Sequence, residues 1–162
     1  METPLINIQD VRDYADLSVN VKERKYNQYI LMAQNRFLSN IIGATCLDEL
    51  VERKCSNSLT TDDNNLLEYI KPYLVAYSYS LYVSSSMKLS LNSGVATLSG
   101  DEATVIGQQS RVTESKKYCL SALSYGERLK TFLAANTTLY PCYEVDVCTV
   151  DTSNSYSEYF GL

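Results

Sequence analysis

The sequence predicts a mainly α-helical fold, and three observations support that prediction. Apolar residues recur every three or four positions over long stretches, as on the buried face of a helix. Polar capping residues precede these stretches. Glycine and proline are scarce, with 6 and 3 of the 162 residues. We therefore expect one helical bundle of four to five helices, with a β-hairpin or arm insertion and an extended C-terminal tail.

The first helix is expected over residues 8–16. Asn7 and Asp10 have the spacing of a capping box, in which each side chain binds the backbone N–H of the other. Ile6 and Val11 are placed to pack against each other around this cap.

The second helix is expected to begin at a second cap, formed by Asn20 and Glu23, and to end at Gly43. Its buried stripe is predicted to contain Tyr26, Ile30, Ala33, Phe37 and Ile41. A brief third helix is expected over residues 46–54.

The fourth helix is expected to follow a cap at residues 60–63, because Asp62 and Asp63 suit the positive end of a helix. Pro72 lies inside this helix, so we expect a kink or a restart there. The predicted buried stripe contains Leu67, Ile70, Leu74, Tyr77 and Leu81.

The last helix is expected over residues 111–135. Its inward positions are small at first and larger later, which predicts a close approach of another helix. These positions are Ser115, Cys119, Ala122, Gly126, Leu129 and Leu133.

The stretch between the last two helices has a different composition. Apolar residues flank the turn-forming triplet Asn92, Ser93 and Gly94, which predicts a hairpin near residues 88–99. The helical domain is therefore expected to cover residues 1–136, with the hairpin or arm at about 88–107.

Residues 137–162 are predicted to form an extended docking tail. This stretch contains no lysine or arginine, but it contains Glu144, Asp146, Asp151 and Glu158. It also contains aromatic residues that suit contacts buried on assembly. The residues predicted to lie at an interface, in the arm and the tail, are Leu91, Val95, Leu98, Tyr140, Tyr143, Tyr156, Tyr159 and Phe160.

The composition does not favour an enzyme. Without any histidine, the chain has no imidazole base and no imidazole metal ligand. The glycines do not form a phosphate-binding loop. Asp62 with Asp63, and Glu49 with Glu52, are the carboxylate pairs that a weaker enzyme hypothesis could use. We expect no catalytic residue, no metal and no cofactor.

Charge and cysteine content restrict the class of protein and the compartment in which it is made. The net charge of −5 disfavours a dedicated nucleic-acid binder, which normally carries a basic face. No apolar run reaches the roughly 18 to 20 residues that span a bilayer, and the N-terminus lacks a signal-peptide pattern. Production in the cytosol is expected, with the five cysteines present as reduced thiols.

The order of these elements resembles the head–tail connector proteins, also called adaptor or neck-ring proteins, of tailed bacteriophages. It is most similar to the branch in gut phages of Bacteroidales, including the ring proteins of crAss-like phages. The likeness covers roughly residues 5–143. It rests on LINIQDVRDY (5–14), NQYILMAQNRFLSNIIG (27–43), YIKPYLVAYSYSLYV (69–83), LNSGV (91–95) and SALSYGERLKTFLAANTTLYPCY (121–143).

The resemblance implies a virion protein, made in the host cytoplasm, that assembles at the head–tail junction into a ring, typically a dodecamer. Its partners are then other copies of itself, the portal protein and the next neck or tail protein. The ring extends the DNA channel without binding the genome specifically. A helical interaction protein that forms no ring is the alternative, and a carboxylate-dependent enzyme is the weaker one.

Overall fold

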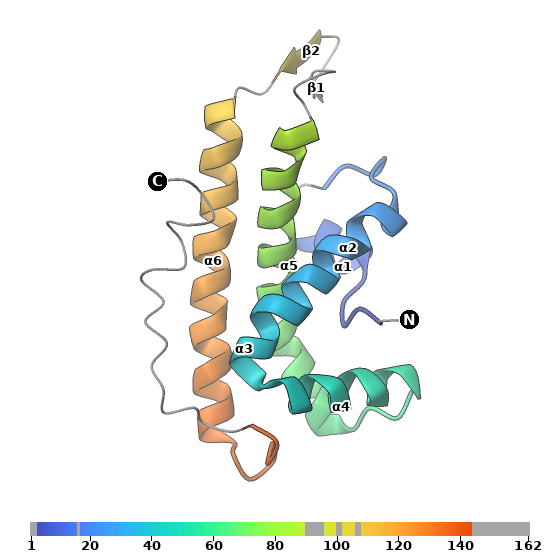
Figure 1. The fold of residues 1–162 in the computed structure, drawn as a ribbon, viewed down its shortest axis with the longest axis vertical. Coiled ribbons are helices and arrows are strands. Elements are labelled where there is room, and N and C mark those ends of the chain that lie inside the picture. Colours follow the sequence, from blue (N-terminus) through green and yellow to red (C-terminus); the bar gives the residue numbers. More distant parts are fainter. Residues whose placement is uncertain (1–2, 16, 90–95, 100–101, 106–107, 144–162) are drawn as a thin grey trace.

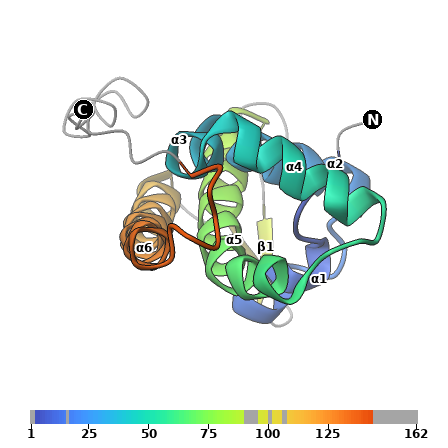
Figure 2. The same ribbon diagram turned by 90° about the horizontal axis from the view of Figure 1, so that it is seen from below.

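The fold is described from a computed structural model, and the description covers residues 3–15, 17–89, 96–99, 102–105 and 108–143. These residues form a mainly α-helical domain. Two long helices, α5 (Thr61–Leu89) and α6 (Gln108–Ala135), run side by side in opposite directions (Figure 1). The shorter helices pack mostly on α5, so α6 lies at one edge of the molecule (Figure 2).

Helix α1 (Ile8–Tyr14) begins at the predicted capping box. The Asn7 Oδ1 atom accepts hydrogen bonds from the Gln9 and Asp10 backbone N–H groups, and the Asp10 carboxylate accepts one from the Asn7 N–H group. Ile6 and Val11 are both buried. The sequence-based prediction for this helix is confirmed.

Helix α2 (Glu23–Ala33), the π-helical segment η1 (Gln34–Leu38) and α3 (Ser39–Ile42) follow one another without a break. The prediction that Asn20 caps this helix is wrong. The N-cap residue is Lys22, which makes no side-chain cap, and the backbone N–H group of Asn20 binds Ser18 instead.

The π-helical segment shifts the buried stripe by one position. Tyr26, Ile30 and Ala33 are buried as predicted, but the next buried apolar residues are Leu38 and Ile42. Phe37 and Ile41 are only half-buried. A π-turn accommodates one more residue than an α-turn, so the residue that follows each predicted position faces the core.

Gln34, the first residue of η1, fastens the N-terminal segment to the domain. The side chain is 2% exposed. Its Oε1 atom accepts a hydrogen bond of 2.9 Å from the Leu5 N–H group, and its Nε2 atom donates to the Thr3 carbonyl oxygen. The same segment is held from the other side, because the Lys54 ammonium donates to the Leu5 carbonyl oxygen.

Gly43 ends α3 with φ of +82°, a backbone conformation that glycine adopts without strain. Helix α4 (Ala44–Cys55) begins immediately after it and runs across the lower end of α5. Burial lowers the pKa of Lys54, in the last turn of α4, because desolvation disfavours its charged form.

Helix α5 continues through Pro72 as one element, so the predicted restart does not occur. A proline inside a helix removes one backbone hydrogen bond and crowds the carbonyl group of residue i−4, and the packing of buried residues on both sides of Pro72 offsets that cost. Four of the five predicted stripe residues are buried, and Leu81 is half-buried.

Small side chains lie between α5 and α6, so the two helices pack closely, as the sequence predicts. Ser80 and Ser115 exchange hydrogen bonds across the interface, and the Ser84 hydroxyl lies 2.6 Å from the Ser115 hydroxyl. These bonds satisfy polar groups that burial otherwise leaves unpaired. The predicted inward residues of α6 are all buried.

Two short strands, β1 (Ala96–Ser99) and β2 (Glu102–Val105), follow α5 and precede α6 in the sequence. They pair antiparallel, with Ala96 opposite Val105. The hairpin predicted around residues 92–94 is not shown, because residues 90–95 lie outside the described part of the chain.

We predict that Gly126→Val lowers the free energy of unfolding by about 1–3 kcal/mol, as overpacking of a closed interface does. A Cβ atom at Gly126 is placed 3.1 Å from Tyr73 Cε2 and 3.2 Å from Ile41 Cδ1. The matched control is Ala134→Val, which introduces the same side chain at an exposed position of α6. Denaturant unfolding of both variants checks the prediction, and equal stabilities contradict it.

Candidate interaction surface

The predicted interface residues fall in three places. Leu91, Val95, Tyr156, Tyr159 and Phe160 lie outside the described residues. Leu98 belongs to strand β1. Tyr140 and Tyr143 lie in the turn that follows α6.

Tyr140 belongs to the core of its own chain. The side chain is 6% exposed, its hydroxyl donates a hydrogen bond of 2.9 Å to the Asp62 carbonyl oxygen, and its ring centroid lies 5.7 Å from that of Phe132. Burial raises the pKa of Tyr140, and the charges of Asp62 and Asp63 raise it further. Little of this side chain remains for contact with a partner.

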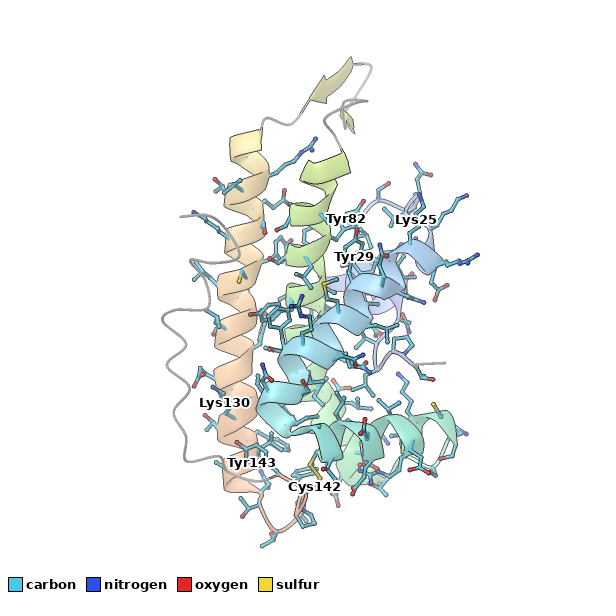
Figure 3. The ribbon with its side chains drawn as sticks, in the orientation of Figure 1. Lys25, Tyr29, Tyr82, Lys130, Cys142 and Tyr143 are labelled. Carbon is cyan, nitrogen blue, oxygen red and sulfur yellow. A yellow bond between two sulfur atoms is a disulfide. The ribbon has the colours of Figure 1, made fainter. Side chains whose placement is uncertain are left out.

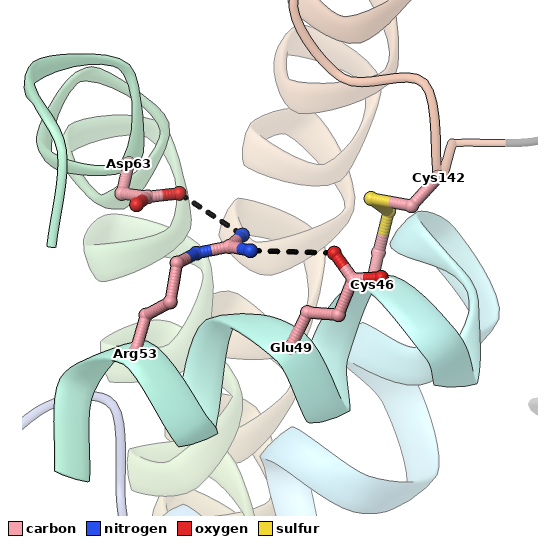
Figure 4. Close-up of a disulfide and its surroundings, with 5 residues drawn as sticks. All are labelled: Cys46, Glu49, Arg53, Asp63 and Cys142. Carbon is pink, nitrogen blue, oxygen red and sulfur yellow. Dashed lines mark hydrogen bonds and ion pairs between the residues drawn. A yellow bond between two sulfur atoms is a disulfide. The ribbon is translucent and has the colours of Figure 1, made fainter. Parts of the chain in front are cut away.

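A disulfide joins Cys46, in the first turn of α4, to Cys142, and the two Cα atoms are 5.2 Å apart (Figure 4). The expectation that all five cysteines are reduced thiols is therefore wrong for this pair. The two residues are separated by 96 positions, so only the fold brings them together. Cys55 is an exposed free thiol and Cys119 a buried one, while Cys148 lies outside the described residues.

The packing of the helical domain extends beyond the predicted boundary at residue 136. The Asn136 carbonyl oxygen accepts hydrogen bonds from the Leu139 and Tyr140 N–H groups. Tyr143 packs against the core, next to the disulfide (Figure 3). The described part of the predicted tail, residues 137–143, thus folds back onto the domain.

The region beside the disulfide is held by an ion-pair network (Figure 4). Arg53 binds the Asp63 carboxylate at 3.1 Å and the Glu49 carboxylate at 3.3 Å. The Asp63 carboxylate also accepts hydrogen bonds from the backbone N–H and the hydroxyl of Thr60, which closes the N-terminus of α5. Burial acts to raise the pKa of Asp63, but these hydrogen bonds and the Arg53 charge lower it below its ordinary value of 3.8.

The outer face of α6 is exposed along the helix. Helix α6 packs against α5 and, through Gly126, against α3, and its opposite side faces solvent (Figure 2). Leu120 lies in the middle of this side and is 67% exposed. The exposed residues of the α6 outer face are Thr113, Lys117, Leu120, Ser124, Glu127, Arg128, Thr131, Ala134 and Ala135.

Helix α6 is also the basic part of the domain. It contains five basic and two acidic residues. Within the described part of the chain, Lys116 and Arg128 form no ion pair, whereas Lys130 pairs with Glu127 at 2.9 Å. Residues 144–162 contain four acidic residues and no basic residue. The excess of negative charge is therefore concentrated after the folded domain.

A shallow hollow of about 650 Å³ lies beside the lower half of this face. Its lining includes Arg128 and the stacked pair of Tyr69 and Phe132, whose ring centroids are 4.1 Å apart. Tyr69 is 37% exposed, so an aromatic surface and a guanidinium group that pairs with no described carboxylate line the same hollow.

The other tyrosines mostly pack between helices. Tyr26, Tyr29 and Tyr82 form one cluster between α2 and α5, with ring centroids 5.4–5.9 Å apart (Figure 3). Burial raises the pKa of Tyr26. The Ser85 hydroxyl donates a hydrogen bond of 2.7 Å to the Tyr29 hydroxyl. Several of the 14 tyrosines therefore pack at interfaces between helices of the same chain.

No arrangement for catalysis or metal binding is found among the described residues. Within them, no three potential metal ligands come together. Of the carboxylates considered for an enzyme, Asp63 and Glu49 are engaged by Arg53. None of the described helices combines the length and the apolar composition needed to cross a membrane.

Sequence comparison places the chain in a family. Residues 20–153 match DUF6712, a family of unknown function, and the chain belongs to this family. No curated protein matches the chain, and no solved structure does.

We predict that Asp63→Asn lowers the free energy of unfolding by about 1–2 kcal/mol at neutral pH, because it removes the charge that pairs with Arg53 and weakens the hydrogen bonds from Thr60. Because the folded state lowers the pKa of Asp63, its contribution is complete above the ordinary pKa of 3.8 and is lost as the pH falls through the folded-state value. The difference from the unmodified protein should therefore shrink in acid.

The control is Asp62→Asn, which changes an exposed acidic residue in the same turn and should alter stability by less than about 0.5 kcal/mol. Unfolding of both variants is measured over a pH series. A stability difference for Asp63→Asn that does not change with pH contradicts the assignment.

Proposed function

We propose that this protein is a structural subunit of a phage virion, forming a ring between the capsid portal and the tail. The α6 outer face supports the proposal most directly. It leaves a long helix uncovered on one side, with an apolar residue, Leu120, among small and basic residues. Contact surfaces typically combine an apolar centre with a polar rim.

Two unlike surfaces of one chain favour a ring. Helix α6, with five basic and two acidic residues, and the acidic residues 144–162 are complementary in charge. Contacts between two different surfaces of identical subunits are heterologous, and they close into a ring when the rotation between subunits permits. In the proposed ring, the acidic segment of one subunit contacts α6 of its neighbour.

The remaining assignments belong to the same proposal. Strands β1 and β2, which belong to the proposed arm at residues 88–107, lie at one end of the α5–α6 pair (Figure 1), which suits contact with an adjacent ring. The portal protein and the next neck or tail protein are the proposed neighbours, and the protein acts at the head–tail junction after synthesis in the host cytoplasm. It is not an enzyme, and its channel lets the genome pass without specific binding, since an acidic subunit offers few phosphate contacts.

We predict that the purified protein forms a closed ring, alone or with the portal protein, and that Leu120→Asp abolishes it. Leu120 is 67% exposed, so the charge should affect a partner rather than the fold. Light scattering and native mass spectrometry measure the mass. The control, Val19→Asp, changes a residue that is 79% exposed in the segment between α1 and α2 and should assemble normally.

A mass equal to that of one chain, both for the protein alone and in the presence of the portal protein, favours the alternative, a helical interaction protein without a ring. A ring that is unaffected by Leu120→Asp keeps the proposed function but excludes the α6 outer face as its interface.

We further predict that deletion of residues 144–162 leaves the helical circular dichroism unchanged and prevents incorporation into particles. The deletion begins after Tyr143, so every described contact of the domain is kept. A glycine–serine segment of the same length serves as the control and should not restore assembly. Normal particles with the truncated protein contradict a docking role for this segment.

A further inference from the structure

The Cys46–Cys142 disulfide fixes the chain at the corner between α3 and α4. Cys46 is the third residue of α4 and is 5% exposed. Cys142 is half-buried, and its carbonyl oxygen lies 4.0 Å from the position of a Cβ atom on Gly43. The bond therefore holds the chain directly against the residue at which α3 ends (Figure 4).

Different contacts hold the chain before and after Pro141. Up to Tyr140, the hydrogen bond to Asp62 and burial beside Phe132 anchor the turn without the disulfide. After Pro141, the described contacts are the disulfide, the packing of Tyr143 and one hydrogen bond from the Tyr143 N–H group to the Tyr140 carbonyl oxygen. The disulfide is the only covalent one among them.

We propose that this disulfide is a reversible redox switch. When it is formed, residues 144–162 start from a fixed point beside α4. When it is reduced, the chain is released from Pro141 onward, while the helical domain and Tyr140 stay in place. The redox switch is a property of the single chain, so it does not depend on ring formation.

The exchange reaction balances with a small thiol and its disulfide. In reduction, a glutathione thiolate attacks Cys142 Sγ, because this sulfur belongs to the more exposed residue. The S–S bond breaks, Cys46 leaves as a thiolate, and a second glutathione then displaces the first from Cys142, which gives oxidised glutathione and two protein thiols. Oxidation is the reverse, and oxidised glutathione takes up the two electrons and two protons.

The position of Cys46 suits this chemistry. The first turn of a helix presents unpaired backbone N–H groups and the positive end of the helix dipole, which stabilise a thiolate and act against the burial of Cys46. A stabilised thiolate is a good leaving group in exchange. The other cysteines described, Cys55 and Cys119, are free thiols, so the test below also asks whether either of them pairs with Cys142.

The test uses the full chain, equilibrated with oxidised or reduced glutathione and then alkylated under native conditions. Peptide mass spectrometry should find Cys46 and Cys142 linked in the oxidised sample and both alkylated in the reduced one. Chymotrypsin should cut after Tyr143 about tenfold faster, or more, in the reduced sample, because local opening controls such cleavage. Tyr29 and Tyr125, within α2 and α6, should stay uncut in both.

Two kinds of variant complete the test. Cys46→Ser should be cut after Tyr143 at the fast rate under all conditions, whereas Cys55→Ser and Cys148→Ser should keep the response. If Cys46→Ser does not fold, the reduced unmodified protein gives the same comparison. The proposal is overturned if Cys142 pairs with another cysteine, if cleavage after Tyr143 is independent of the redox state, or if reduction also exposes Tyr29 and Tyr125.

Discussion

The close approach of α5 and α6 is the constraint on which the rest of the structure depends. Serine pairs and Gly126 keep the two backbones near each other, and larger side chains at the same positions would force them apart. Because the interface is narrow, its polar hydroxyls must bond to one another rather than to water. The pair then presents two outward sides. One is covered by α1, α2 and α3, and no described helix or strand covers the other.

Tyrosines fill the wider spaces that this arrangement leaves. Where α2 crosses α5 the rings of Tyr26, Tyr29 and Tyr82 meet edge to face or tilted, and their hydroxyls reach serine side chains. A ring with a polar tip suits such positions, because it buries a large area and still satisfies its own hydrogen bond. The high tyrosine content thus serves the interior of the subunit as well as its surface.

The lower end of the domain combines three different attachments. The Arg53 network joins α4 to the start of α5, the Tyr140 hydroxyl binds the backbone in the same turn of α5, and the disulfide ties the chain after α6 to α4. Together they fix the described end of the chain, residues 140–143, at the lower end of the domain.

The sequence by itself determined the helical class, the caps at Asn7 and Thr60, and the inward stripe of α6, because these depend on residues within one or two helical turns. It also contained Leu120, an apolar residue on a polar stripe, whose meaning needed the position of α6 at the edge. Tertiary structure alone decided the shift at η1 and the burial of Gln34, since the N-terminal segment must find a partner there. It alone paired Cys46 with Cys142, because proximity across 96 residues is a property of the packed helices and not of any local pattern.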